Sequence, residues 1–169
     1  VEQAEFTVTT ASDSGEGSLR QAIVQANETA GADVITFDSS LSEETISLTS
    51  WQLEITDALT ITGLGSDELI ISGNENSRIF QIDDSNDQTE IEVAINGLTL
   101  EEGEAVATTE GNFERGGAIL NREEVSLSDS KITGNRANSG GGIANDGTMT
   151  INNTSIDRNA SSGDPRFAD

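Results

Sequence analysis

The chain contains no cysteine, no histidine and no tyrosine, and it has a single tryptophan and a single proline. Without cysteine it cannot form a disulfide framework, use a thiol in catalysis or bind zinc through thiolates. Without histidine it lacks the most common general base and the most common metal ligand of proteins. These absences exclude most familiar hydrolase chemistry.

Positive charge is also scarce, because 8 lysine and arginine residues face 31 aspartate and glutamate residues, which leaves a net charge of −23. Nucleic acids and anionic lipids bind to clustered positive charge, so we predict no nucleic-acid partner. The apolar runs are short, so we predict no membrane insertion in this segment. No signal peptide opens the chain at Val1, and we expect any such leader to have been removed.

The 169 residues suit one domain with a continuous core. A high net charge with few apolar residues is typical of disorder, but the apolar residues here recur in short alternating clusters. Such clusters, bounded by Gly, Asn, Asp or Ser, predict short β-strands joined by turns. The predicted strands are 34–37, 59–62, 69–72, 79–82, 93–95, 125–127 and 149–151.

An internal repeat distinguishes among the all-β folds. A shift of 24 residues aligns positions of the same kind in the last third of the chain: Gly117, Ile119, Asn121, Val125, Leu127, Ile132 and Asn135 with Gly141, Ile143, Asn145, Met149, Ile151, Ile156 and Asn159. A shift of 32 residues aligns 93–100 with 125–132, and a polar insertion at 102–115 accounts for the difference from 24. A shift of 34 residues aligns 59–63 with 93–97. A period of 24 suits one turn of a parallel β-solenoid, in which equivalent residues stack about 4.8 Å apart.

Two pairs of asparagines follow the same shift, Asn121 with Asn145 and Asn135 with Asn159. Asparagine tolerates a left-handed backbone, and its amide can hydrogen-bond to the equivalent amide of the next turn of the solenoid. We therefore predict an asparagine ladder. The alternative interpretation is a polar binding site.

Glycines recur just before these asparagines, as Gly116 and Gly117 and again at 140–142. We interpret both runs as tight corners that need a positive φ. A phosphate-binding loop is the alternative, but neither run has a P-loop spacing or a helix behind it.

The segment 18–27 departs from the β pattern. Its apolar residues have helical spacing: Leu19, Ala22, Ile23 and Ala26. Ser18 and Gln21 form a capping box, so the pattern predicts a short amphipathic helix that begins at Ser18 and ends before Gly31. A solenoid must cover the apolar end of its first turn, so we expect this helix to act as a cap, preceded by a strand at 6–9.

The segment 6–23 resembles the CSLREA-type N-terminal motif of secreted bacterial right-handed parallel β-helix proteins with a pectin-lyase-like fold. Residues 18–20 and Ala22 match the core of that motif, whereas Gly17 and Gln21 replace its Cys and Glu. The blocks 116–119 and 141–143 are similar to repeats of polymorphic outer-membrane and other β-helical surface proteins. The resemblance implies an all-β, right-handed parallel β-helix with an N-terminal capping helix.

These observations predict three regions: a strand and capping helix at 1–33, parallel β-helix coils at 34–163, and a C-terminal segment at 164–169. The last segment resembles the G-D-P-x-F-x-D stretch that lies partway along related β-helices. We therefore expect either that the natural protein continues or that its open end stacks against another molecule.

The resemblance leaves two functions open, since such helices occur in adhesins, in cell-wall and matrix proteins, and in polysaccharide-degrading enzymes. It implies that lyases of the fold use Ca²⁺ held by aspartates together with a Lys or Arg base. The residues that would provide such chemistry are Arg115, Arg122, Lys131, Arg136, Arg158, Asp129, Asp146 and Asp157. They are scattered singly among turn positions, so we favour a non-enzymatic protein.

Calcium binding is a separate hypothesis. Asp83, Asp84 and Asp87 lie in one loop, and carboxylate oxygens are the ligands that Ca²⁺ prefers. The loop has neither EF-hand spacing nor a β-roll nonapeptide repeat, so the alternative is a solvated acidic turn. Trp51 and Phe113 are the aromatics best suited to contact a sugar, although single aromatics in a solenoid more often serve packing.

We therefore expect a secreted or cell-surface module for adhesion, matrix assembly or structural spacing, and a fragment of a larger surface protein. The alternative is the N-terminal part of a carbohydrate-active β-helix enzyme, a polysaccharide lyase or glycosidase. The expected partners are other copies of the protein and cell-surface or matrix components. The acidic surface should repel acidic glycans unless Ca²⁺ bridges them.

Overall fold

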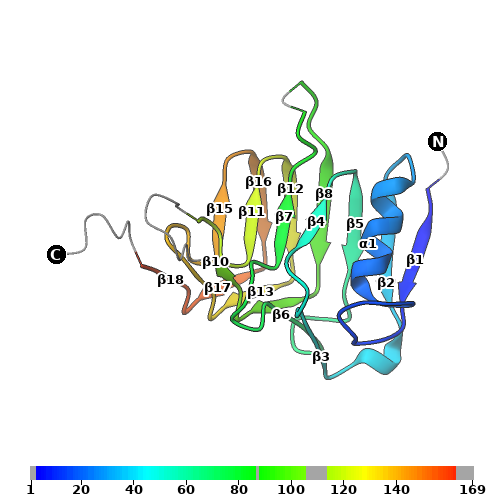
Figure 1. The fold of residues 1–169 in the computed structure, drawn as a ribbon, viewed down its shortest axis with the longest axis horizontal. Coiled ribbons are helices and arrows are strands. Elements are labelled where there is room, and N and C mark those ends of the chain that lie inside the picture. The colour runs from blue at the N-terminus through cyan, green and yellow to red at the C-terminus, as the bar shows by residue number, and fades with distance from the viewer. Residues whose placement is uncertain (1–2, 87, 106–113, 163–169) are drawn as a thin grey trace.

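The protein is described by a computed structural model that covers residues 3–86, 88–105 and 114–162 (Figure 1). Within these residues it contains one α-helix, α1 (Leu19–Glu28), a short 3-10 helix, η1 (Ser39–Leu41), and strands that pair in parallel. The expectation of a mainly β chain with parallel strands is confirmed.

The paired strands belong to four sheets. The six-stranded sheet contains β1 (Glu5–Val8), β2 (Asp33–Phe37), β5 (Leu59–Thr62), β8 (Glu92–Asn96), β12 (Glu124–Ser128) and β16 (Thr148–Asn152). The five-stranded sheet contains β3 (Glu44–Ser47), β6 (Leu69–Ser72), β9 (Thr99–Glu101), β13 (Lys131–Thr133) and β17 (Ser155–Asp157). The four-stranded sheet contains β4 (Leu53–Ile55), β7 (Phe80–Ile82), β11 (Ile119–Asn121) and β15 (Ile143–Asn145). The three-stranded sheet contains β10 (Glu104–Ala105), β14 (Arg136–Ala137) and β18 (Ala160–Ser161).

From β2 onward the chain visits the sheets in a constant order: the six-stranded sheet, the five-stranded sheet, the four-stranded sheet, and then the six-stranded sheet again. From β9 onward each pass also adds a strand of the three-stranded sheet, between the five-stranded and four-stranded sheets. We call one such pass a circuit. Each circuit adds its strands beside those of the circuit before, so equivalent elements lie side by side along the molecule (Figure 1).

The pairing register confirms the sequence repeat. Ile119 is paired with Ile143 and Asn121 with Asn145, as the shift of 24 residues predicts. The same shift holds between β12 and β16 and between β13 and β17. The longer shifts also hold, since β5 pairs with β8 and β8 with β12 in the predicted register.

Inward-facing apolar residues form columns that run through the circuits. In the six-stranded sheet, Ile35, Ile61, Ile95 and Leu127 are consecutive partners, and each is 0% exposed. Burying a side chain of this size contributes about 1.5–3 kcal/mol, so such columns supply most of the driving force for folding. The next member, Ile151, is 43% exposed because no circuit in the described structure covers it.

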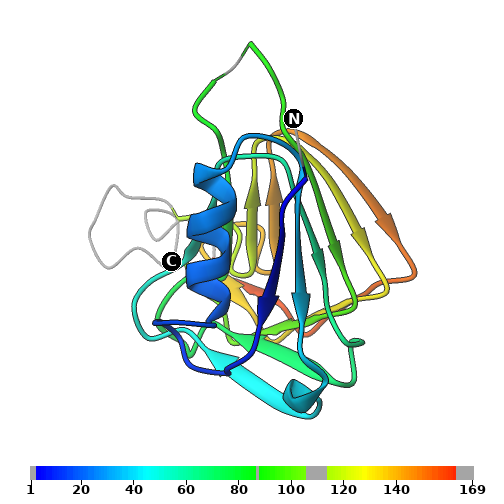
Figure 2. The ribbon, with the colours of Figure 1, turned by 90° about the vertical axis from the view of Figure 1, so that its right-hand side faces the viewer.

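Helix α1 forms where the capping box predicts it. The Ser18 side chain accepts a hydrogen bond from the Gln21 N–H, and the Gln21 side chain accepts one from the Gly17 N–H. The four predicted apolar residues are all buried: Leu19, Ala22, Ile23 and Ala26. Figure 2 shows the molecule along the stack of circuits. Helix α1 lies beside the sheets at the N-terminal end of this stack.

Side chains of α1 occupy the free edge of β4, the outermost strand of the four-stranded sheet. Asn27 donates to the Glu54 carbonyl at 2.8 Å and accepts from the Thr56 N–H at 3.0 Å. Arg20 donates to the carbonyls of Trp51 and Gln52 at 2.6 and 3.0 Å. The helix therefore satisfies backbone groups that a further strand would otherwise bind.

The predicted asparagine ladder is confirmed. The Asn121 side-chain amide donates to the Asn145 side-chain carbonyl at 2.7 Å, and Asn135 donates to Asn159 at 2.9 Å. Asn121 and Asn135 are 0% and 1% exposed, so these are buried corner contacts between circuits.

The predicted glycine corners are only partly correct. Gly116 and Gly140 have φ values of 67° and 60°, as expected for tight turns. Gly117 and Gly141 do not have a positive φ, and their role is a different one. A Cβ atom at Gly117 would fall on the Gly141 carbonyl oxygen, so glycine is needed there because successive circuits approach closely.

The predicted regions at 1–33 and 34–163 share a sheet, because β1 pairs with β2 in register from Glu5 to Val8. The third region, 164–169, lies outside the described residues. Several strands were not predicted, chiefly those of two or three residues such as β10, β14 and β18. Within the described residues, no helix has the length and apolar character needed to cross a membrane.

Replacing Asn135 by alanine should lower the free energy of unfolding by about 2–4 kcal/mol, since several buried hydrogen bonds are lost together. Asn135 donates to the carbonyls of Leu100 and Thr133 and accepts from the Gly103 N–H. Urea unfolding followed by circular dichroism measures the loss. Asn152→Ala is the control and should change stability by less than about 0.5 kcal/mol, because Asn152 is exposed. Equal losses of unfolding free energy in the two variants would contradict a stabilising role for the asparagine ladder.

The Asp13 carboxylate should make stability depend on pH. Burial alone would raise the pKa of Asp13, but hydrogen bonds from Ser50, Arg20 and Thr49 and the Arg20 charge outweigh burial and lower it. A lowered pKa stabilises the fold above the unfolded-state value of about 3.9, and this contribution is lost as the pH falls through the folded-state value. Asp13→Asn should therefore be less stable than the wild type at pH 7, and the difference should shrink below about pH 4.

Unfolding free energies measured across a pH series test this expectation. Asp67→Asn removes the same charge from an exposed residue and is the matched control. A difference between wild type and Asp13→Asn that stays constant down to acidic pH would contradict it.

Candidate functional site

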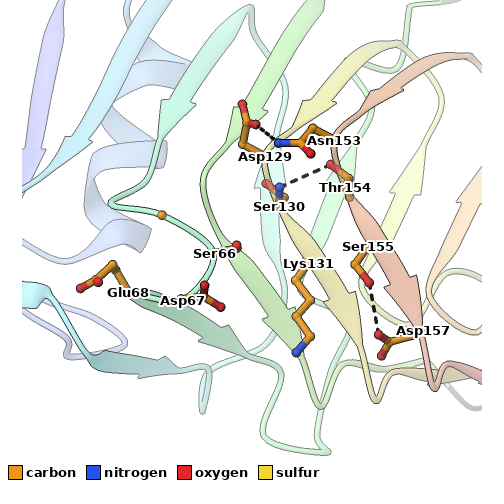
Figure 3. Close-up of a pocket in the computed structure, with 11 residues that line it drawn as sticks. Ser66, Asp67, Glu68, Asp129, Ser130, Lys131, Asn153, Thr154, Ser155 and Asp157 are labelled. Carbon is orange, nitrogen blue, oxygen red and sulfur yellow. Dashed lines mark hydrogen bonds between the residues drawn. The ribbon is translucent and has the colours of Figure 1, made fainter.

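A groove of about 980 Å³ lies on the outer side of the five-stranded sheet, between the segment 65–68 and strands β13 and β17 (Figure 3). Four carboxylates line it, those of Asp67, Glu68, Asp129 and Asp157, together with the single lysine, Lys131. The remaining lining is mainly serine, threonine and asparagine. The groove is therefore a polar, acidic surface with one cation in it.

Turns of successive circuits form one wall of this groove. Asp129 and Asn153 have positive φ values of 48° and 42°, and the Asn153 amide donates to the Asp129 carboxylate at 2.5 Å. Thr133 donates to the Asp157 carboxylate at 2.6 Å, and this hydrogen bond is the main reason that the pKa of Asp157 is lowered. Both carboxylates thus have structural partners, and Asp157 is held in its ionised form.

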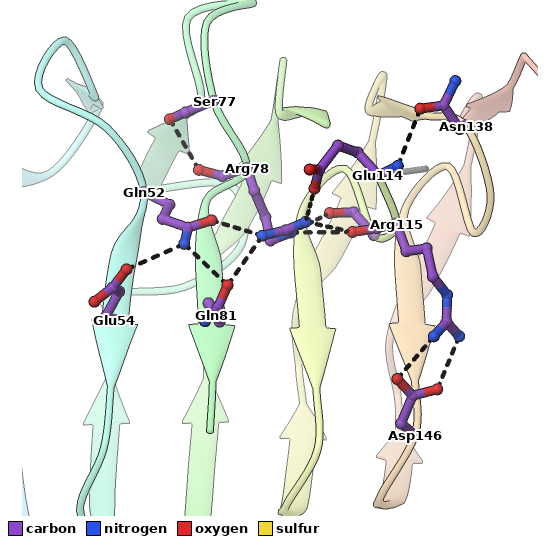
Figure 4. Close-up of polar contacts among 10 residues, drawn as sticks. Gln52, Glu54, Ser77, Arg78, Gln81, Glu114, Arg115, Asn138 and Asp146 are labelled. Atoms are coloured by element: carbon purple, nitrogen blue, oxygen red, sulfur yellow. Dashed lines mark hydrogen bonds and ion pairs between the residues drawn. The ribbon is translucent and has the colours of Figure 1, made fainter. Parts of the chain in front are cut away.

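The structure brings only part of the predicted catalytic set together. Lys131, Asp129 and Asp157 share the groove. Arg115 instead forms a two-pronged ion pair with Asp146, with both N–O distances 2.8 Å, on another face of the molecule (Figure 4). The hydrogen bond from Arg115 lowers the pKa of Asp146.

Of the other candidate arginines, Arg158 lies near a residue of the groove, whereas Arg122 and Arg136 do not line it. Arg122 pairs with Asp83 at 2.6 Å, and Arg158 lies 4.0 Å from Asp157 with an 83% exposed side chain. Arg136 is exposed, and its side chain forms no hydrogen bond or ion pair with another described residue. The described groups therefore do not converge on a buried acid–base pair.

A carboxylate that the sequence did not suggest, that of Glu123, lies beside the predicted calcium loop. Asp83, Asp84 and Glu123 bring carboxylate oxygens within 4.8 Å of one another, whereas Asp87 lies outside the described residues. Glu123 is only 4% exposed and comes from the next circuit. No local signal indicated Glu123, because it lies 39 residues beyond Asp84 in the sequence.

The carboxylates of this cluster already have protein partners. Glu123 accepts from the N–H groups of Asp84 and Ile91 at 3.0 and 3.1 Å. Asp83 accepts from the Ser85 N–H and pairs with Arg122. A calcium ion would have to compete with these donors, so the cluster resembles a self-satisfied acidic turn as much as a metal site.

A buried arginine that the sequence analysis did not single out joins three circuits. Arg78 is 6% exposed, and burial lowers its pKa. It donates to the side chains of Gln52 and Gln81 at 2.7 and 3.2 Å, and to the Gly116 carbonyl at 2.9 Å (Figure 4). It also pairs with Glu114 at 3.2 Å. These acceptors lie in three circuits, so Arg78 holds the circuits together.

Comparison of the sequence with protein-family models finds no match, and comparison with curated proteins finds no similar sequence.

Replacing Arg78 by leucine should lower the free energy of unfolding by about 2–4 kcal/mol, because buried acceptors in three circuits lose their donor. Arg136→Leu makes the same exchange at an exposed position and should change stability by less than about 0.5 kcal/mol. Chemical unfolding of both variants measures the difference. A similar, small effect in both would refute the role assigned to Arg78.

Proposed function

We propose that this chain is a right-handed parallel β-helix that acts, without enzymatic activity, as a secreted or cell-surface module for adhesion, matrix assembly or structural spacing. The observation that carries the proposal is the repeated parallel register of equivalent strands through successive circuits. Repeats that stack only on their neighbours produce long, regular surfaces, which suit extended binding or spacing.

Two further points support a right-handed helix and membership of the family that the sequence resembles. Connections between parallel strands of one sheet are right-handed in about 98% of proteins, because of the twist of the strands. The segment 6–23 resembles the start of secreted right-handed β-helix proteins, and α1 begins within that segment.

The charge of the chain supports an extracellular role. A net charge of −23 on outward-facing positions keeps the protein hydrated, and salt at extracellular strength screens such charges beyond about 8 Å. Other copies of the protein and matrix components are the proposed partners. Calcium would serve as a bridge between acidic side chains, such as Asp83 and Asp84, and acidic glycans.

The groove of Figure 3 favours a second candidate function, that of a carbohydrate-active enzyme. It brings Lys131 to the same surface as Asp129 and Asp157, and Lys131 makes no side-chain hydrogen bond or ion pair with another described residue. A lysine base beside carboxylates is the minimum that a lyase would need. We rank this candidate second because the two aspartates already accept hydrogen bonds from neighbouring side chains.

Incubation with polygalacturonate and with neutral polysaccharides, each with Ca²⁺ or with EDTA, distinguishes the two functions. We expect co-sedimentation with at least one polymer and no shortening of any, measured by reducing ends and by unsaturated uronate products. Lys131→Ala should then bind as the wild type does, and Arg136→Ala is the matched control. Product formation by the wild type that is lost in Lys131→Ala would overturn the non-enzymatic proposal in favour of a lyase.

A further inference from the structure

The single tryptophan of the chain lies on the surface. Among the described residues, the exposed large apolar side chains are Val24, Trp51, Ile151 and Ile156. The two isoleucines belong to the last described circuit, and their equivalents in earlier circuits are buried. Val24 and Trp51 lie at the opposite end of the stack, which α1 already covers, so a missing circuit does not explain their exposure.

Val24 and Trp51 line the same groove, of about 340 Å³, between α1 and the segment 50–54. Trp51 is 60% exposed and Val24 is 49% exposed. Polar side chains complete the groove, including Asn27 and Glu54. Pockets of this size, with an aromatic surface and a few polar groups, are typical of small-ligand sites.

The backbone of Trp51 is held in an unfavourable conformation. Its φ is 94°, in the region that favours glycine. Arg20 fixes it by donating to the Trp51 carbonyl, and Arg20 is in turn paired with Asp13 at 2.7 Å. A turn alone would be made more easily by glycine, and strained residues of this kind cluster at ligand-binding positions.

The surroundings of the groove exclude several ligands. A peptide cannot add as a strand beside β4, because Asn27 and Arg20 already bind the backbone groups on that edge. An amphipathic helix would meet the polar side chains of Arg20, Asn27 and Glu54. Anionic ligands are disfavoured by the net charge of −23 and by the Glu54 carboxylate.

We propose that this groove binds a neutral saccharide, with the apolar face of a sugar ring stacked on Trp51 and a sugar hydroxyl donating to the Glu54 carboxylate. A neutral sugar combines an apolar ring face with hydroxyl groups, which matches a groove lined by both a tryptophan and a glutamate. Glu54 accepts a long hydrogen bond from Gln52, at 3.3 Å, through one of its two oxygens. This inference rests on the proposed adhesive role, and it gives neutral saccharides as the class of ligand for that role.

The chain itself supplies the reporter, since Trp51 is its only tryptophan. We would titrate it with neutral oligosaccharides of glucose, mannose, xylose and N-acetylglucosamine, and with oligogalacturonate, while recording tryptophan fluorescence. We expect a saturable change with at least one neutral oligosaccharide and none with oligogalacturonate. No change with any neutral sugar, or equal binding of oligogalacturonate, would overturn the proposal.

Trp51→Gly separates binding from folding. It should weaken saccharide affinity at least tenfold by calorimetry without lowering the urea midpoint, because glycine relieves the positive φ. Glu54→Gln should weaken binding less, and Ile156→Ala, at the other end of the stack, should leave it unchanged. A lowered midpoint with retained saccharide binding would mean that Trp51 serves packing alone, and would overturn the proposal.

The two proposals fail in different ways. Polysaccharide cleavage that depends on Lys131 would refute the non-enzymatic function while leaving a Trp51 signal intact. Absence of the Trp51 signal would refute the saccharide site while leaving the β-helical module unaffected.

Discussion

In-register stacking of circuits is the constraint on which the rest of the structure depends. Each strand pairs in parallel with its equivalents, so residues such as Ile61, Ile95 and Leu127 must fill the same position in successive circuits. A slip of one residue would turn each inward side chain outward. The buried amides of Asn121 and Asn135 oppose such a slip, because each hydrogen-bonds to the asparagine at the equivalent corner. Apolar columns supply the driving force, and the corner amides fix the register.

The two ends of the described stack differ in how far their apolar residues and strand edges are covered. At the N-terminal end, α1 covers the core with its apolar face and satisfies the β4 edge through Asn27 and Arg20. At the other end, Ile151 and Ile156 remain about half exposed, and β16 and β17 are edge strands. An unpaired edge beside apolar side chains binds further strands readily. Within the described residues, α1 therefore covers one end of the stack, whereas the last circuit leaves an unpaired strand edge at the other end.

Function on such a scaffold arises where the chain departs from regular stacking. Outward-facing positions of the strands are free to vary, and here they carry mainly hydroxyl and acidic groups. Both of the grooves described above lie beside irregular segments: the groove containing Lys131 lies against 65–68, and the groove containing Trp51 lies between α1 and 50–54. This is the usual division between a rigid scaffold and the loops that it positions. Arg78 and the cluster at Glu123 strengthen the scaffold, because their hydrogen bonds join neighbouring circuits.

The repeat, its register and the start of α1 follow from the amino-acid sequence alone. Residues that stack at a constant shift resemble one another, so the pairing of Ile119 with Ile143 could be predicted from the repeat. Ser18 marked the start of α1 because its capping hydrogen bond is local in the sequence. The partners of Arg78, the approach of Glu123 to Asp83 and the exposure of Trp51 depend on the three-dimensional fold and have no local signal in the sequence. The contact of Arg78 with Gln52 joins positions 26 residues apart, and the contact of Glu123 with Asp84 joins positions 39 residues apart. Both contacts depend on how each circuit closes at its corners. The two-residue strands were missed for a similar reason, since they are too short for alternation and exist only because the neighbouring circuits pair with them.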